Sequence, residues 1–157
     1  MIRPFQPEDA PDCYEVIRSC IECDASLTER LREGLLRAES PQSIQERARL
    51  FYVAVYDSGQ NILGLGGLDL NEIRLLSVSP AHQGQGIGCQ ILRHLEAMVP
   101  PALFTDIFVY AALSAEGFYL AQGYTSRGSH EIEVLGLPMP TIFMSKLIPQ
   151  SRRANFG

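Results

Sequence analysis

The stretch that decides the fold reads Leu75-Leu76-Ser77-Val78-Ser79-Pro80-Ala81-His82-Gln83-Gly84-Gln85-Gly86-Ile87-Gly88. Its apolar first part predicts a strand over 72–78, which Ser79-Pro80 ends. The three glycines at the end let the backbone approach a ligand closely. Because a helix is expected to start at about Gly84, the N–H groups of the turn lie at the positive end of its dipole. The stretch therefore predicts a strand, a phosphate-binding turn and a helix in succession.

Other glycine-rich turns fit this segment less well. The spacing of Gly84, Gly86 and Gly88 is not G-x-G-x-x-G, and the turn follows a hairpin instead of opening an alternating βαβ series. A P-loop requires a Lys, and none follows Gly88. No G-x-S-x-G nucleophile motif is present either. A tight strand-to-helix connection that binds nothing is the alternative left open by these residues.

Outward from this stretch, hydrophobic periodicity and turn residues divide the chain into short elements. The expected elements are a strand at 2–5, helices at about 9–23, 26–38 and 43–50, a hairpin over 51–56 and 62–70, the strand at 72–78, a helix at about 84–99, a strand at about 103–111, a short helix at 114–122, and strands at about 130–135 and 141–147. The strand–helix–strand step predicts a right-handed parallel crossover, and the hairpins are antiparallel. The predicted fold class is α/β, with a mixed, mostly antiparallel central sheet of about six to seven strands and helices on both faces.

Length and composition set further limits. The chain has 157 residues, which predicts one domain over 1–150 and a loose C-terminal tail over 151–157. It lacks a long apolar segment and a signal-peptide region, so we expect a cytoplasmic protein without a membrane partner. The net charge of −5 argues against a nucleic-acid partner, because binding phosphates requires a basic surface.

The four cysteines include the pair Cys20-x-x-Cys23, which is a spacing used by metal and redox sites. However, Cys20 belongs to an apolar helical stripe formed by positions 13, 16, 17, 20 and 21. Thiols on such a face usually behave as small hydrophobes. We therefore expect no metal site.

Two motifs give the chain a family resemblance. From Gln83 to Gly88 it resembles the pyrophosphate signature Q/R-x-x-G-x-G/A of the GNAT superfamily of acyl-CoA-dependent N-acetyltransferases. The segment from Ala115 to Tyr124 is similar to that family's A-x-x-F-Y-x-x-x-G-F/Y helix. The resemblance covers about residues 50–147 well, and the first 50 residues only in the general order of elements.

The resemblance implies that strands four and five, at about 72–78 and 104–110, are parallel and splayed to admit the pantetheine arm of acetyl-CoA, the co-substrate. The backbone of Leu76 and Val78 would bond to the pantetheine amides, with Ser77 between them and the Val78 N–H near the thioester carbonyl. Ser114 is expected first to cap the short helix and then to contact the pantetheine end. The amides that would hold the pyrophosphate are those of Gln83, Gly84, Gln85, Gly86, Ile87 and Gly88.

The reaction implied is direct attack of an acceptor amine on the thioester. By its place in the motif, Tyr119 is the candidate acid for the CoA sulfur. Full proton transfer from a phenol of pKa near 10 to a thiolate near 8.5 is uphill by roughly 2 kcal/mol, which favours a hydrogen bond or a relayed proton. The alternative is a tyrosine that only packs under the helix.

Glu72 begins the strand that enters the site, and the resemblance makes it the candidate base. An ordinary glutamate, with a pKa near 4.3, is a weak base for an ammonium near 10. It would need an intervening water, burial, or an acceptor that arrives partly neutral. A solvated charge at a strand end is the alternative, and Asp69 is the reserve candidate.

We therefore predict an N-acetyltransferase that moves an acetyl group from acetyl-CoA to a primary amine of a small molecule or peptide, in a ternary complex. By analogy with the family, the two helices predicted near the N-terminus and the loop 137–140 would line the acceptor pocket. The alternatives are a non-catalytic acyl-CoA-binding module, a protein lysine or N-terminal acetyltransferase, and a structural protein that associates through a hairpin edge. A homodimer is compatible with this fold.

Overall fold

The computed structural model describes residues 1–149, and the predicted tail at 151–157 lies outside them. The strands are β1 (Ile2–Pro4), β2 (Tyr52–Asp57), β3 (Ile62–Asp69), β4 (Glu72–Val78), β5 (Asp106–Ala112), β6 (Thr125–Val134) and β7 (Leu137–Leu147). The helices are α1 (Ala10–Cys23), α2 (Glu29–Ala38), α3 (Pro41–Leu50), α4 (Ile87–Met98) and α5 (Glu116–Ala121), with 3-10 turns η1 (Pro7–Asp9), η2 (Pro80–His82) and η3 (Leu113–Ala115). The strands form one sheet in the order β1-β2-β3-β4-β5-β7-β6, with β4 and β5 parallel and the other pairs antiparallel. This confirms the predicted mixed α/β fold.

Two hydrophobic cores lie on opposite faces of the sheet. On one face, the apolar stripe of α4 packs against alternate side chains of the strands, including Ala54 and Ile73. Close packing is possible because β3 carries Gly66, where an added Cβ would lie 2.7 Å from Ile91. On the other face, α1 and α3 cover Val53 and Val55 of β2. Successive residues of a strand thus serve different cores, as the alternation of side chains requires.

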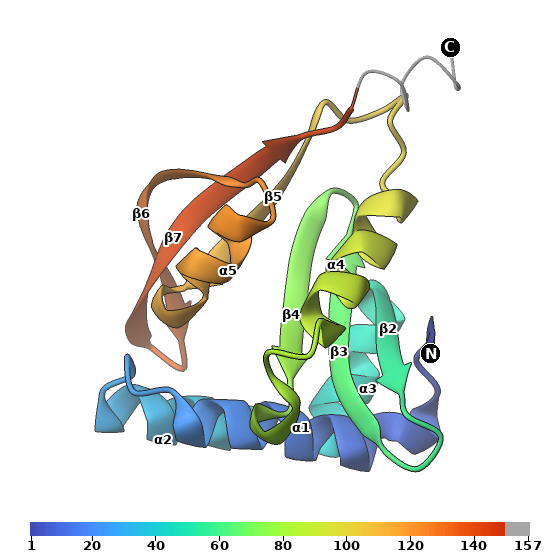
Figure 1. The fold of residues 1–157 in the computed structure, drawn as a ribbon. Coiled ribbons are helices and arrows are strands. Elements are labelled where there is room, and N and C mark those ends of the chain that lie inside the picture. The colour runs from blue at the N-terminus through green and yellow to red at the C-terminus, as the bar shows by residue number, and fades with distance from the viewer. Residues whose placement is uncertain (150–157) are drawn as a thin grey trace.

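The sheet divides between β4 and β5. These strands pair at Glu72 and Phe108. Asn71 ties them there, because its carbonyl accepts from the Phe108 N–H at 3.0 Å and its side-chain amide donates to the Asp106 carbonyl at 3.1 Å. Beyond that pair the two strands diverge, and α1 and α2 run one after the other across the open end (Figure 1). We call this diverging region, from Glu72 to Val78 on β4 and from Phe108 to Ala112 on β5, the fork.

A bulge interrupts β4 inside the fork. Leu75 has φ +58°, and the register between β3 and β4 passes from Leu65–Ser77 to Gly67–Arg74 without pairing Leu75 or Leu76. The irregularity sends the two leucine side chains to opposite cores, Leu75 toward α1 and Leu76 toward α4. A bulge also leaves its extra residue unpaired, so peptide groups at this point are released from the β3 ladder.

The last hairpin differs from the sequence prediction. The strands were expected at about 130–135 and 141–147 around a loop at 136–140, but β6 begins at Thr125 and β7 at Leu137. The connection is a two-residue turn in which Leu135 and Gly136 both have positive φ, as hairpin turns of this length prefer. Pro138 and Pro140 are accommodated because β5 pairs with β7 from Thr141 onward, which leaves one edge of β7 free at the prolines.

Candidate active site

The glycine turn presents unobstructed backbone at the start of α4. Gly84 and Gly86 have φ of +79° and +85°, and an added Cβ at either position would meet nothing within 4 Å. Gly86 is the N-cap of α4, and no side chain caps the helix. Residues 83–86 are exposed. The helix begins at Ile87 instead of Gly84 because Gly86 is left-handed, so the turn leaves donors at the positive end of a 12-residue helix open to an anion.

Each predicted phosphate-turn residue has a distinct setting. Ile87 contributes its side chain to the α4 core, so its backbone is what remains for a ligand. Gly88 lies under the Phe118 ring, which an added Cβ would approach to 3.4 Å. The Gln83 side chain turns back and donates to the Val78 carbonyl at 3.1 Å. The turn is thereby joined to the end of β4.

The end of β4 directs hydrogen-bonding groups into the fork. The Ser79 N–H donates to the Leu63 carbonyl of β3 at 2.8 Å, and Val78 lies opposite Gly64. In an antiparallel ladder this makes Val78 a non-hydrogen-bonded position, whose N–H and C=O point away from β3. The Val78 carbonyl accepts from the Cys20 thiol of α1 at 3.1 Å as well as from Gln83. The Val78 N–H faces the same side of the strand.

The role of Cys20 at this point did not follow from the sequence. Its place on an apolar helical stripe is confirmed, since Cys20 packs against the core beneath α1. Burial raises the pKa of its thiol to about 11, so the group remains a protonated donor to Val78. Helical periodicity places a residue on a face, but it carries no information about which carbonyl that face meets.

Glu72 lies where the fork closes, opposite Phe108. Its side chain is 22% exposed, and Arg74 Nε lies 3.9 Å from its Oε1. Partial burial raises the pKa of Glu72, Arg74 opposes that shift, and Asp69 adds to it. The reserve candidate Asp69 is more exposed and pairs with Arg74 at 3.3 Å. Of the two carboxylates, Glu72 is the more buried and has the longer contact with the guanidinium.

Tyr119 lies in the core under α4 and is 4% exposed. Its ring packs edge-on against Phe118 and Tyr124, with centroids 5.1 Å and 5.3 Å away. Burial, with a smaller contribution from the charge of Glu96, raises the pKa of the phenol, so the group holds its proton. The hydroxyl makes no hydrogen bond with any of residues 1–149. A buried phenol without an acceptor is costly and is a donor available to a ligand.

Ser114 does not cap the short helix, so that expectation is wrong. It lies inside η3, and its hydroxyl donates to the Asp24 carboxylate at 3.0 Å. Asp24 is the C-cap of α1 and also accepts from the Ser26 hydroxyl at 2.6 Å. The Ser114–Asp24 bond joins the end of the β5 arm to the α1–α2 connection, next to the open end of the fork.

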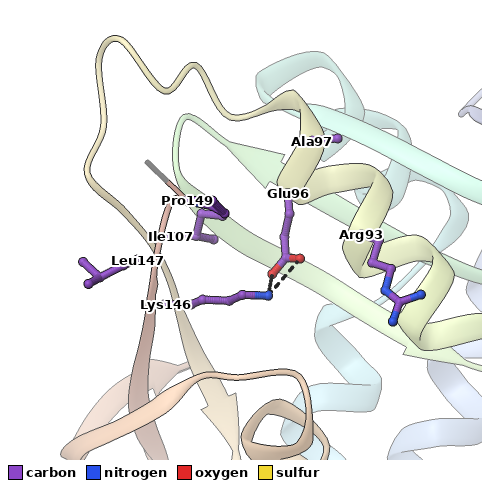
Figure 2. Close-up of a pocket in the computed structure, with 7 residues that line it drawn as sticks. All are labelled: Arg93, Glu96, Ala97, Ile107, Lys146, Leu147 and Pro149. Carbon is purple, nitrogen blue, oxygen red and sulfur yellow. Dashed lines mark hydrogen bonds and ion pairs between the residues drawn. The ribbon is translucent and has the colours of Figure 1, made fainter. Parts of the chain in front are cut away.

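A second set of contacts joins the two parts of the sheet that the fork separates. These contacts lie on the face that α4 covers, remote from the glycine turn. Lys146 of β7 reaches Glu96 of α4 with Nζ–Oε2 at 3.2 Å, and the Tyr124 hydroxyl donates to the same carboxylate at 2.7 Å. Figure 2 shows this ion pair at the edge of a hollow of about 220 Å³, which Arg93 and Pro149 also line. Neither this hollow nor one of about 200 Å³ at Ser129–Glu131 includes a predicted catalytic or cofactor-binding residue, although the second includes Pro140 of the segment predicted to line the acceptor pocket.

Two further properties concern residues 1–149 alone. None of their helices has both the length and the apolar character needed to cross a membrane. In the same part of the chain, no group of three or more His, Cys, Asp or Glu side chains is arranged to hold a metal ion.

Comparison with known families gives one match. A family model described as an acetyltransferase (GNAT) domain matches residues 23–146. The match includes the glycine turn, both arms of the fork, and Tyr119. No curated protein sequence matches the chain.

Solved structures share the fold at low sequence identity. A GCN5-related N-acetyltransferase from Rhodopseudomonas palustris is 20% identical, with a TM-score of 0.87 over 94% of this chain and 95% of that one. The paia N-acetyltransferase of Thermoplasma acidophilum in complex with coenzyme A is 16% identical, with a TM-score of 0.72 over 94% and 98%. A phosphinothricin acetyltransferase from Sinorhizobium meliloti in complex with AcCoA is 17% identical, with a TM-score of 0.72 over 96% and 89%.

Proposed function

This chain belongs to the GNAT acetyltransferase family, and from that premise we propose that it transfers the acetyl group of acetyl-CoA to a primary amine by direct attack in a ternary complex. The observation that carries the proposal is the position of the open glycine turn beside the fork. The turn offers donors for a diphosphate, and the fork offers peptide groups of β4 that β3 does not use. These are the two features that an extended nucleotide thioester needs from its site.

The residues of the turn fit a diphosphate. Gly84 and Gly86 have space where other residues would carry a side chain, so phosphate oxygens can approach the N–H groups of 84–88. The bound nucleotide supplies an activated acetyl thioester, and the chain supplies its placement. Gln83 supports the arrangement from the side by tying the turn to the Val78 carbonyl.

Within the fork, the N–H groups of Leu76 and Val78 are the proposed donors to the pantetheine arm and the thioester carbonyl. Leu76 is four residues from Glu72, which at about 3.3 Å per residue is roughly 13 Å along the strand. Val78 is six residues from Glu72, or roughly 20 Å. A carbonyl bound at Leu76 therefore lies closer to the candidate base. A peptide N–H held there would stabilise the oxyanion as the tetrahedral intermediate forms.

Glu72 is the proposed general base, acting through water because the strand distance exceeds direct reach. Its partial burial supports the role, since the raised pKa makes the carboxylate a better proton acceptor. The neutral amine nitrogen forms a bond to the acetyl carbon and its proton passes through water to Glu72, while the carbon–sulfur bond breaks with its electron pair on sulfur, so that coenzyme A leaves as the thiolate.

Tyr119 is the proposed donor to the departing sulfur. The raised pKa makes complete transfer of its proton to a thiolate less favourable than for an ordinary phenol, so the expected contribution is a hydrogen bond. The absence of an acceptor within residues 1–149 supports this role, because the hydroxyl is not committed elsewhere.

Binding and turnover can be tested separately. Acetyl-CoA at about 100 times its Kd should raise the free energy of unfolding by about 2.7 kcal/mol, which a thermal shift detects, and NAD should have no effect. Thiol release is then measured with small primary amines and with lysine and N-terminal peptides. Stabilisation together with amine-dependent thiol release supports the proposal. Stabilisation without thiol release across the panel would indicate a binding module, and release with peptides alone would indicate a protein acetyltransferase.

A further inference from the structure

Four aromatic rings form a continuous patch on strands β5, β7 and β6, which form the part of the sheet on the β5 side of the fork. The Tyr110 ring lies at the centre, with centroids 5.9 Å from Phe108, 5.4 Å from Phe143 and 4.7 Å from His130. Phe108 and Phe143 are themselves 5.7 Å apart. We call these four residues the ring patch. Such spacings are those of interacting aromatic pairs.

The strand register assigns the ring patch to one face of the sheet. Tyr110 lies opposite Phe143, and His130 lies opposite Thr141, two residues from Phe143 on the same strand. The alternate residues of β5, Ile107, Val109 and Ala111, are buried against α4 and α5 on the other face. Leu137, which shares the face of Phe143 by its even spacing, packs against Gly34 of α2. The ring patch therefore lies on the face toward α2.

The ring patch remains accessible. Tyr110 is 36% exposed, His130 is exposed, and Phe108 and Phe143 are half-buried. Since α4 and α5 cover the opposite face, neither helix covers these rings. A group of aromatic side chains packed together and left open beside a reaction site offers flat apolar surface to a substrate.

Glu72 belongs to the same face. It is the parallel partner of Phe108 across the closed end of the fork, at a strand spacing of about 4.8 Å. Tyr110 is two residues further along, or roughly 6.7 Å. Glu72 and Asp69 share the guanidinium of Arg74, so this corner has two carboxylates for one cation. A negative corner thus adjoins the aromatic surface, and that combination is complementary to an ammonium attached to an apolar ring.

We propose that the acceptor is an arylalkylamine, a primary amine joined to an aromatic ring by a linker of about two carbons, with its ring on the ring patch and its amine in the fork, at the thioester and connected to Glu72 through water. This assignment rests on the proposed acetyl transfer and specifies its substrate class. The glycine turn opens at the N-terminus of α4 on the opposite face, so the amine and the nucleotide approach the fork from different sides of the sheet. The two ligands can then be bound together.

The experiment compares 2-phenylethylamine with 2-cyclohexylethylamine, which has the same linker and a saturated ring. Binding to the CoA-loaded protein is measured by calorimetry, and kcat/KM by thiol release from acetyl-CoA. The aromatic amine is expected to be favoured by about three- to tenfold in both, the range that corresponds to one or two aromatic contacts. In Tyr110→Leu and in Phe143→Leu the preference should vanish through a higher KM for the amine, with the KM for acetyl-CoA unchanged.

Tyr56→Leu is the matched control, because it makes the same change on β2, away from the fork. It should keep the preference. Tyr110 is partly exposed, so Tyr110→Leu retains the fold even where Phe143→Leu loses stability.

The outcomes separate the two proposals. Equal binding and equal turnover of the two amines would overturn the arylalkylamine assignment and leave acetyl transfer standing. Selective binding of the aromatic amine that Tyr110→Leu abolishes, without thiol release from any amine, would support the ring patch and contradict the catalytic proposal. Absence of binding by the aromatic amine to the CoA-loaded protein would overturn the assignment whatever the turnover.

Discussion

Glu72 and Phe108 face each other across β4 and β5 at the position where the two strands separate. The carboxylate and the first ring of the ring patch therefore lie on one face of the sheet, at the closed end of the fork. The glycine turn lies at the other end of β4, joined to it by the Gln83 contact with Val78. The proposed base and the proposed diphosphate site therefore lie at opposite ends of β4, and the proposed acceptor surface lies on β5, β6 and β7.

Replacing Glu72 by Gln tests the base. We expect kcat/KM to fall by about 10²-fold or more, the usual contribution of a general base. Because burial raises the pKa of Glu72, the acidic limb of the wild-type pH–rate profile should begin above the pH range in which an ordinary glutamate titrates. Glu72→Gln should lose that acidic limb. Asp69→Asn is the control, as it removes an exposed carboxylate from the same hairpin and should keep the limb. An unchanged rate for Glu72→Gln at every pH would remove the assignment.

The same substitution should affect stability in a direction set by the pKa. Burial raises the pKa of Glu72 in the folded protein above that of an ordinary glutamate, so the protonated form is favoured by folding. This stabilisation is complete below the unfolded pKa and is lost as the pH rises through the folded pKa. Glu72→Gln should therefore melt at a higher temperature than the wild type at pH 7, with the difference shrinking toward pH 4. A lower Tm at pH 7 would show that the contact with Arg74 outweighs burial.

Tyr119→Phe and Tyr124→Phe remove hydroxyls from adjacent buried rings, with opposite expected results. The Tyr119 hydroxyl has no acceptor among residues 1–149, so its removal should raise the free energy of unfolding by about 1 kcal/mol while lowering kcat by about 10²-fold. The Tyr124 hydroxyl donates to the Glu96 carboxylate, so its removal should cost about 1.5–3 kcal/mol. Denaturant unfolding and thiol release measure both. Full activity in Tyr119→Phe would identify Tyr119 as a packing residue.

Gly86→Ala tests the turn against a matched glycine elsewhere. Both Gly86 and Gly59 have positive φ and open space where a Cβ would lie. Each alanine substitution should cost about 1–2 kcal/mol of stability from left-handed backbone. Only the change at Gly86 should also weaken acetyl-CoA binding, as measured by titration calorimetry. Equal affinities in the two variants would show that the diphosphate lies elsewhere.

The cysteines should differ in reactivity. Burial raises the pKa of Cys13 to about 12 and that of Cys20 to about 11, which keeps both thiols protonated near neutral pH. Cys23 is exposed. Iodoacetamide at pH 7.5 should therefore label Cys23 well before Cys13 or Cys20, as peptide mass spectrometry can show. Rapid labelling of Cys20 would contradict its packed position against Val78.

The sequence predicted much of the fold because its strongest signals were local. The apolar stripe of α1, the crossover through α4 and the glycines of the turn are periodic or conformational features, and each appears where the spacing placed it. The first half of β6 escaped prediction because its side chains are exposed, so it lacks apolar alternation. Pro138 and Pro140 suggested a loop, since nothing in the sequence indicates that one edge of β7 is free there.

The glycine turn was predictable from its residues, and the structure shows Gly84 and Gly86 left-handed and open there. The roles of Glu72 and Val78 came from the family resemblance and stay predictions, and the contacts around them were not predictable. The Cys20–Val78 and Ser114–Asp24 contacts join residues 58 and 90 positions apart, and no spacing rule connects such pairs. The ring patch was missed for the same reason, because only the pairing of β5, β7 and β6 assembles its rings on one face.

A crystal structure of the protein with coenzyme A would decide whether the turn and the fork hold the nucleotide. We expect the diphosphate within hydrogen-bonding distance of the N–H groups of residues 84–88, and the pantetheine arm in the fork against Leu76 and Val78. Coenzyme A bound at another surface, with the turn empty or filled by the protein's own side chains, would contradict this expectation.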